Sequence, residues 1–190
     1  MMRVIAGSAR RIPLITPAGE GTRPTTDRIK ETLFNILSPT LADASFLDLF
    51  AGSGGIGIEA LSRGAGKAVF SDRSPEAIRC IRENLEKTGL ADRAEVYQED
   101  AFSVLRRLEA RHLAFDFIFL DPPYGQGLER KALEILAASS LMDDQTWVIV
   151  ETKTGEDFSW LSDCGLVIDR IKEYGSNQHL FIGRKKPAEE

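Results

Sequence analysis

The sequence predicts an α/β fold, built on a mostly parallel sheet whose last strand is antiparallel. Between residues 45 and 152, short apolar segments alternate with segments of helical periodicity, which is typical of βαβ units. Near the C-terminus, two strand-like segments stand close together in the chain, which indicates a hairpin. The chain has 190 residues and is 43% hydrophobic, enough to bury the core of one domain.

The N-terminal part precedes this alternation. Two short strands, "RVIAG" and "RIPLITP", predict a small β-hairpin, and "PAGEGTRP" is a loop. A helix follows, with a cap within residues 25–27 and an end at Pro39. We therefore divide the chain into an N-terminal basic arm, residues 1–24, and a main domain, residues 25–190.

The main domain is expected to contain seven strands. The first five are "SFLDLFA", "KAVFSD", "RAEVYQ", "FDFIFL" and "TWVIVET". The helices between them are "GIGIEALSRG", "SPEAIRCIRENLEKTG", "DAFSVLRRLEARH" and "LERKALEILAAS". Only residues 175–177 separate the last two strands, "LVIDRIKEY" and "QHLFIGRK", so the final strand is expected to be antiparallel.

Charge is unevenly distributed along the chain. The net charge is −5, but residues 1–30 hold six basic and two acidic side chains, so they carry +4 and the remainder −9. A basic arm on an acidic body is typical of a protein that touches phosphates with one face, although a merely solvated surface is the alternative. The arginines that we expect at such phosphates are Arg3, Arg10, Arg11 and Arg23.

Several classes of protein are disfavoured. No apolar run approaches the roughly 20 residues of a membrane span, and the N-terminus lacks the pattern of a signal peptide. Cys80 and Cys164 are expected to be free thiols of a cytoplasmic protein. His112 and His179 stand alone, which indicates surface or structural roles and no metal site.

A glycine loop predicts a cofactor that carries an adenosine. The segment "LDLFAGSGGIG" places Gly52, Gly54 and Gly57 between a strand and a helix, where glycine permits a tight turn and close approach of a ligand. Asp72 ends the next strand, where an acid accepts hydrogen bonds from ribose hydroxyls. NAD and S-adenosylmethionine both satisfy this pattern.

Three further features bear on the choice of cofactor. Asp48 lies inside the first strand, four residues before Gly52. Asp100 ends the third strand, where an acid or its neighbours could meet an adenine edge. The reversed final strand is unusual for dinucleotide-binding folds.

The segment "FIFLDPPYG" points to the substrate, because ligands of open parallel sheets bind at the carboxyl ends of the strands. Proline pairs also simply end strands. Here, however, Asp121 and the Pro122 carbonyl supply acceptors, Pro123 makes them rigid, and Tyr124 supplies a flat ring for stacking. This combination suits the exocyclic amine of a nucleobase. Asp121 would polarise the amine and stabilise the charge that grows during methyl transfer.

Together, "DLFAGSG", "DPPY" and "RPTTDRIKETLFNIL" resemble the RsmD-type family, bacterial methyltransferases of guanine N2 in 16S ribosomal RNA. The resemblance implies a class I S-adenosylmethionine-dependent methyltransferase, a Rossmann-like three-layer sandwich with seven strands. It also implies S-adenosylmethionine as cofactor, and 16S ribosomal RNA or an assembling small ribosomal subunit as partner. We expect a monomer.

The resemblance also assigns residues. It implies that the target base is bound by Asp121, Pro122, Pro123 and Tyr124. It implies that the cofactor is bound by Thr26, Asp48, Phe50, Gly52, Gly54, Asp72, Asp100 and Ala101. Within that set, Asp72 would bind the ribose, Asp100 would lie by the adenine, and residues 25–28 would close over the methionine end.

Other functions remain open from the sequence. Guanine offers two adjacent donors, N1–H and N2–H₂, to one carboxylate, whereas adenine offers one. The same motif nevertheless serves adenine-N6 methyltransferases of DNA or RNA, which usually carry an additional recognition region. A non-catalytic nucleotide-binding or RNA-binding module would not need Asp121 beside Tyr124. An NAD oxidoreductase lacks a plausible histidine or lysine at a strand tip.

Overall fold

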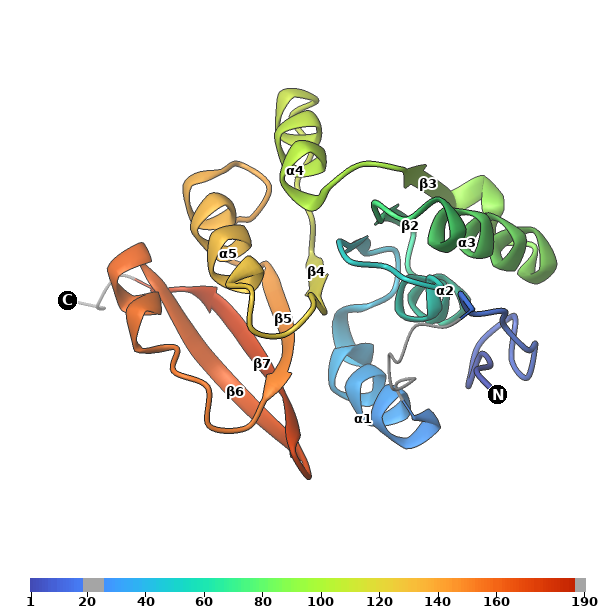
Figure 1. The fold of residues 1–190 in the computed structure, drawn as a ribbon, viewed down its shortest axis with the longest axis horizontal. Coiled ribbons are helices and arrows are strands. Elements are labelled where there is room, and N and C mark those ends of the chain that lie inside the picture. The colour runs from blue at the N-terminus through green and yellow to red at the C-terminus, as the bar shows by residue number, and fades with distance from the viewer. Residues whose placement is uncertain (19–25, 187–190) are drawn as a thin grey trace. The chain divides into compact units, whose positions relative to one another are not determined.

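A computed structural model describes residues 1–18 and 26–186, and the chain forms two compact units, Met1–Ala101 and Phe102–Glu190. In Figure 1 the first unit runs from blue to green and the second from yellow-green to red. The predicted boundary at residue 24 falls on residues outside the described ranges, so the division into arm and main domain stays a prediction.

The first unit contains three parallel strands, in the order β3-β2-β1. The strands are β1 (Ser45–Asp48), β2 (Lys67–Ser71) and β3 (Ala94–Tyr97). The helices are α1 (Asp27–Leu37), η1 (Ser38–Thr40), α2 (Gly55–Ser62), α3 (Pro75–Thr88) and η2 (Ala91–Arg93). Helix α4 (Ala101–Ala110) begins at the last residue of this unit.

The ends of these helices follow the predicted signals. The Thr26 hydroxyl accepts a hydrogen bond from the Ile29 amide at 3.3 Å and so caps α1. Ser74 caps α3 in the same way, and Gly89 ends α3 with φ of 70°. Leu33, Phe34 and Leu37 point α1 into the core, where each is fully buried.

The second unit contains four strands, and the last two of them form a long hairpin, visible in orange and red in Figure 1. Strands β4 (Phe117–Leu120) and β5 (Trp147–Lys153) are parallel, whereas β7 (Asn177–Arg184) is antiparallel to both β5 and β6 (Leu166–Tyr174). The predicted reversed strand is therefore confirmed. Helix α5 (Leu128–Ala138) follows β4, and η3 (Ser159–Cys164) precedes β6.

The β6–β7 turn is tighter than the sequence indicated. Its two residues are Gly175 and Ser176, and Asn177 is already the first residue of β7. Gly175 has φ of 66°, which a two-residue hairpin turn requires at this position.

The N-terminal hairpin is present in reduced form. Its only strand-like pairing among the described residues is an isolated antiparallel bridge, Arg3↔Pro13. The amides of Ile5 and Ala6 donate to the Glu59 carboxylate of α2 at 2.9 and 3.0 Å, so they are unavailable to a strand partner. The arm is therefore fixed both by the Glu59 carboxylate and by main-chain hydrogen bonds between its two sides, such as Val4 N–H to the Ile12 carbonyl at 3.0 Å and Arg11 N–H to the Val4 carbonyl at 2.8 Å.

Two sequence expectations about composition have structural counterparts. Cys80 and Cys164 are both free. No helix among residues 1–18 and 26–186 is long and apolar enough to cross a membrane.

Candidate active site

The predicted cofactor loop lies entirely in the first unit, between β1 and α2. Gly52 and Gly54 have φ of 55° and 79°, in the left-handed region that glycine enters at little cost. The Gly54 amide donates to the Ala51 carbonyl at 2.7 Å, which closes the turn. A Cβ added at Gly52 would meet no atom within 4 Å, so the loop is open on that side. This geometry fits a ligand approaching the backbone.

Gly57, the third glycine of the motif, serves a different purpose. A Cβ there would lie 2.3 Å from the Phe70 ring on β2. Only glycine therefore allows α2 to pack this closely against β2. The helix N-terminus is thereby fixed relative to the strand that ends beside Asp72.

Asp72 holds the loop through main-chain hydrogen bonds. Its Oδ2 accepts from the Gly52 amide at 3.0 Å, and its Oδ1 accepts from the Ser74 amide at 2.9 Å. Since each carboxylate oxygen has two lone pairs, acceptor capacity remains for ribose hydroxyls. The structure thus brings together Asp72 and Gly52 as the motif predicted.

Asp48 lies beneath the loop. Its side chain is 2% exposed, and its Oδ2 accepts from the Gly57 amide at 3.0 Å. Burial, with a smaller contribution from the nearby Asp72 charge, raises the pKa of Asp48 to about 7 against the lowering effect of the Gly57 hydrogen bond. The observed role of Asp48 is to hold α2, and its contact with a cofactor stays a prediction.

For the remaining predicted cofactor residues of the first unit, the structure gives a position and a degree of burial. Phe50 is half-buried in the loop, Asp100 is exposed before α4, and Ala101 is buried at its first position. Thr26 is exposed and caps α1. None of these placements tests a role in binding S-adenosylmethionine.

A buried charge cluster, which sequence reasoning missed, ties the N-terminal segment to α2. Glu59 is fully buried, and besides the amides of Ile5 and Ala6 its carboxylate pairs with Lys30 Nζ at 3.4 Å and Arg63 Nε at 2.8 Å. Lys30 is 2% exposed, and burial lowers its pKa, while Glu59 opposes the shift. The one charged residue in the apolar helix "GIGIEALS" was the available signal.

The predicted RNA-binding arginines differ in their surroundings. Arg3 is paired with Asp27 at 2.8 Å, so its guanidinium already has an anionic partner. Arg10 and Arg11 are exposed. Arg23 lies outside the described residues.

The predicted substrate site lies in the second unit, directly after β4. Asp121 is half-buried, Pro122 is buried, and Pro123 and Tyr124 are exposed. The rigid Pro-Pro pair therefore ends the strand and brings Tyr124 to the surface, with 43% of the residue exposed.

Side chains from β5 and β7 hold Tyr124. Asn177 Nδ2 donates to the Tyr124 hydroxyl at 3.1 Å, and Lys153 Nζ lies 5.2 Å from the centroid of the ring. Partial burial raises the pKa of Tyr124, and the carboxylates of Asp121 and Glu151 raise it further, so the phenol is neutral at pH 7. Sequence reasoning missed Lys153, and it assigned Asn177 only to a turn.

A second polar pair lies on the same two strands. His179, which the sequence indicated as surface or structural, is fully buried, and its Nε2 lies 3.0 Å from Glu151 Oε2. The rings of Phe119 and Tyr174 pack edge-on against the imidazole, at centroid distances of 5.8 and 5.0 Å. His179 is therefore a structural residue of the sheet.

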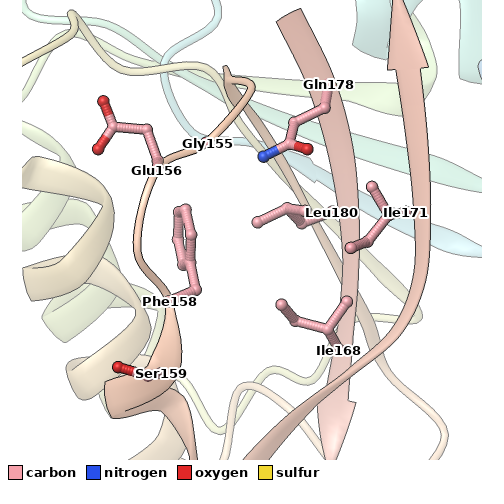
Figure 2. A pocket seen from close by; sticks show the side chains of 8 residues that line it. All are labelled: Gly155, Glu156, Phe158, Ser159, Ile168, Ile171, Gln178 and Leu180. Atoms are coloured by element: carbon pink, nitrogen blue, oxygen red, sulfur yellow. The ribbon is translucent and has the colours of Figure 1, made fainter.

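A cavity of about 360 Å³ in the second unit lies on the other face of β7. Figure 2 shows Phe158 facing Ile168, Ile171 and Leu180 across it. Gln178 and Leu180 line it, whereas the alternate residues Asn177 and His179 contact Tyr124 and Glu151. No predicted site residue lines this cavity.

Comparison with known proteins agrees with this arrangement. A family model described as "Conserved hypothetical protein 95" matches residues 2–183. "Putative rRNA methyltransferase YlbH" of Bacillus subtilis is 41% identical over 150 residues, 79% of this chain and 82% of that protein. "Ribosomal RNA small subunit methyltransferase D" of Escherichia coli is 38% identical over 152 residues, 80% of this chain and 75% of that protein.

Solved structures agree as well. "Putative methyltransferase yhhF from Escherichia coli" is 32% identical and superposes with a TM-score of 0.81, covering 97% of this chain and 98% of that chain. The predicted fold class, a methyltransferase-type α/β sheet with an antiparallel last strand, is thereby confirmed.

Proposed function

We propose that this chain, which belongs to the Conserved hypothetical protein 95 family, transfers a methyl group from S-adenosylmethionine to guanine N2 in small-subunit ribosomal RNA. The observation that carries the proposal is the tip of β4, where a half-buried carboxylate precedes a rigid Pro-Pro pair and a restrained aromatic ring. The names of the relatives, a small-subunit ribosomal RNA methyltransferase among them, support the class of substrate.

The first unit supplies the proposed cofactor site. Gly52 leaves the loop open on one side, and Asp72 fixes it while retaining acceptor capacity for two ribose hydroxyls. When bound there, S-adenosylmethionine supplies an electrophilic methyl group. Phe50, Asp100, Ala101 and Thr26 are proposed to complete this binding site.

The second unit supplies the proposed site for the target amine. Asp121 and the Pro122 carbonyl are proposed to accept hydrogen bonds from the two N–H groups of the target amine. These bonds orient the nitrogen lone pair, which is otherwise delocalised into the base. As the nitrogen gains a methyl group, positive charge grows on it, and the fixed carboxylate of Asp121 stabilises that charge. Asp121 then receives the proton that the methylated amine releases.

Guanine is proposed over adenine because of its donor pattern. The carboxylate of Asp121 can accept from guanine N1–H and N2–H at once, whereas adenine offers it only one N–H beside an acceptor nitrogen. The Tyr124 ring offers a stacking surface to either base. An adenine-N6 methyltransferase is therefore the alternative that the experiment below has to separate.

The arm is proposed to supply part of the RNA contact. Arg10 and Arg11 are exposed and belong to the segment of net charge +4, and Arg23 belongs to it as well. Arg3 reaches a phosphate only by leaving Asp27. We further propose that a monomer acts on an assembling subunit in the cytoplasm.

The test is methyl transfer by the purified protein, with S-adenosylmethionine labelled in its methyl group. Naked 16S ribosomal RNA, small subunits and their precursor particles are taken from cells that lack the gene. We expect one labelled nucleotide, and mass mapping should identify it as N2-methylguanosine. Asp121→Asn, which keeps the shape of the side chain but removes its charge, is the inactive control.

Three outcomes would contradict parts of this proposal. Label recovered as N6-methyladenosine would move the target to adenine. Label in protein or DNA but not in RNA would overturn the substrate class. Transfer by Asp121→Asn at the wild-type rate would remove the carboxylate from the reaction.

A further inference from the structure

We propose that Asn177 and Lys153 are positioning residues that fix Tyr124 as the stacking platform of the target nucleotide, with the Lys153 ammonium also available to that nucleotide's phosphate. This inference rests on the proposed function, and it adds residues of β5 and β7 to the substrate site. Both residues lie outside the Asp121–Tyr124 motif.

The first support is the environment of Tyr124 itself. The residue is 43% exposed and is followed by Gly125 and Gly127, with φ of 73° and 65°. Such a segment restrains a side chain weakly by itself. A stacking ring that is free to turn would lose conformational entropy on binding, and this loss weakens affinity. A ring fixed in advance avoids that cost.

The second support is that the two contacts restrain different parts of the ring. The Asn177 amide holds the hydroxyl at 3.1 Å, at the end of the side chain. The Lys153 ammonium lies 5.2 Å from the ring centroid and covers one face, at a distance typical of a cation–π contact. The base is therefore expected to stack on the other face.

The third support is that the sheet holds these two side chains together. Lys153 and Asn177 are directly opposite each other in the β5–β7 ladder, so their side chains share a face. Two residues along the same face, Glu151 and His179 form the buried 3.0 Å pair. The platform thus rests on a section of sheet in which both strands are fixed by side chains.

The positive charge of Lys153 gives this residue a second role, which is to attract a phosphate. A base stacked on Tyr124 carries a phosphate within a few bonds of its ribose, and Lys153 is exposed at the end of β5 beside that ring. A cation at such a place attracts the phosphate backbone of the target nucleotide without reading its base sequence.

A double-mutant cycle tests the role of Asn177. Asn177→Leu removes the donor at nearly the same side-chain size, and Tyr124→Phe removes the hydroxyl while keeping the ring. Each change is expected to raise KM for RNA about threefold to tenfold, the range of one net hydrogen bond, with a smaller effect on kcat. The double mutant should be no worse than either single variant, since both remove one interaction.

Lys153→Met tests the cation. Its loss is expected to reduce the slope of log Kd for RNA against log salt by about one unit. Lys67→Met is the matched control, because Lys67 is exposed at the first residue of β2, the end of the strand away from Asp72. Ser176→Ala is the control for disturbance of the turn. Affinity for S-adenosylmethionine should be unchanged in every variant.

The outcomes separate this inference from the proposed function. If the wild-type protein transfers no methyl group to ribosomal RNA, the proposed function fails. If the wild type is active, an Asn177→Leu variant with wild-type KM, or effects that add fully in the double mutant, would overturn the role of Asn177. A salt slope of Lys153→Met equal to that of Lys67→Met would overturn the phosphate contact.

Discussion

The two units hold their site residues by different kinds of hydrogen bond. In the first unit, Asp72 and Asp48 bond to main-chain amides of Gly52, Ser74 and Gly57. In the second unit, side chains hold Tyr124: the amide of Asn177 and the ammonium of Lys153. A loop fixed through the backbone keeps its shape when side chains are exchanged. The contacts of Tyr124, in contrast, can be altered by exchanging side chains without moving a strand.

The units also differ in how they bury charge. The first encloses the Glu59 carboxylate with Lys30 and Arg63, whereas the second places the buried imidazole of His179 against the partly exposed Glu151. Breaking an ion cluster leaves an uncompensated charge in the core. The first unit should therefore be more sensitive to loss of a single buried side chain.

The largest expected effect is on stability. Glu59→Ala leaves Lys30 buried without its carboxylate and removes the acceptor of two arm amides, so we expect a loss of about 3–5 kcal/mol in the free energy of unfolding. Urea unfolding measures it. Glu83→Ala is the control, because Glu83 pairs with Arg79 at the surface, at 3.6 Å, and should cost less than about 1 kcal/mol. Equal losses in the two variants would mean that the buried Glu59 cluster contributes no more to stability than the surface pair of Glu83 and Arg79.

The next largest effect should be on turnover, and it is expected from a substitution in the second unit. Asp121→Ala removes the proposed acceptor of the amine, and a fixed group of this kind is worth about 10²–10³ in rate. Single-turnover kinetics with labelled S-adenosylmethionine measure the change, and calorimetry should show unchanged cofactor affinity. A variant that retained more than half of the wild-type kcat would exclude Asp121 from the chemistry.

Asp72→Ala should give the opposite balance. Loss of the ribose acceptor and of the bond to Gly52 is expected to weaken S-adenosylmethionine binding about tenfold to a hundredfold, as for hydrogen bonds to a charged group. Calorimetry and the cofactor KM report it. Unchanged affinity would mean that Asp72 only shapes the loop.

Asp48 should make the stability of the first unit depend on pH. Its pKa is about 7 in the folded protein against 3.8 ordinarily, so the folded state holds the extra proton between these values. Stability should therefore fall as pH rises from 4 to 7, by up to about 1.4 kcal/mol per pH unit. Asp48→Asn, which can still accept from the Gly57 amide, should lack this component. The measurement is the free energy of unfolding of both proteins between pH 4 and pH 7. The same dependence on pH in the two proteins would contradict this prediction.

The smallest effect concerns the arm. Arg10→Ala/Arg11→Ala should lower the salt slope of RNA binding by about two units, nearly independently of base sequence, because phosphate contacts release counterions. Cofactor affinity should not change. Replacement of the exposed pair Arg106 and Arg107 by alanine is a control of equal charge. An unchanged slope in the arm variant would leave the arginines as solvated surface.

The sequence predicted the regular elements better than the contacts between them. β6 has the predicted bounds, residues 166–174, because its turn and flanking residues are local signals. The glycine loop and Asp72 were also predictable, since the spacing of such a motif reflects a single βαβ unit. Tyr124 and Asn177, in contrast, are 53 residues apart, and no local pattern announces their bond.

The N-terminal hairpin shows the same limit. Its residues have strand-like alternation, but Glu59 of α2 takes the amides of Ile5 and Ala6, 54 and 53 residues away. Local propensity cannot reveal a competitor that distant in the chain. The predicted hairpin is therefore realised as one bridge with a few main-chain hydrogen bonds beside it, without two regular strands.

The two-residue turn between β6 and β7 limits how this part of the gene can vary in length. Successive side chains of a strand point to opposite faces, so a register slip of one position would exchange every neighbour of β7. Asn177 and His179 would turn toward the cavity, and Gln178 would turn toward Glu151 and Tyr124. We expect length variants at Gly175 and Ser176 to be selected against, while loops without such a register tolerate insertions and deletions.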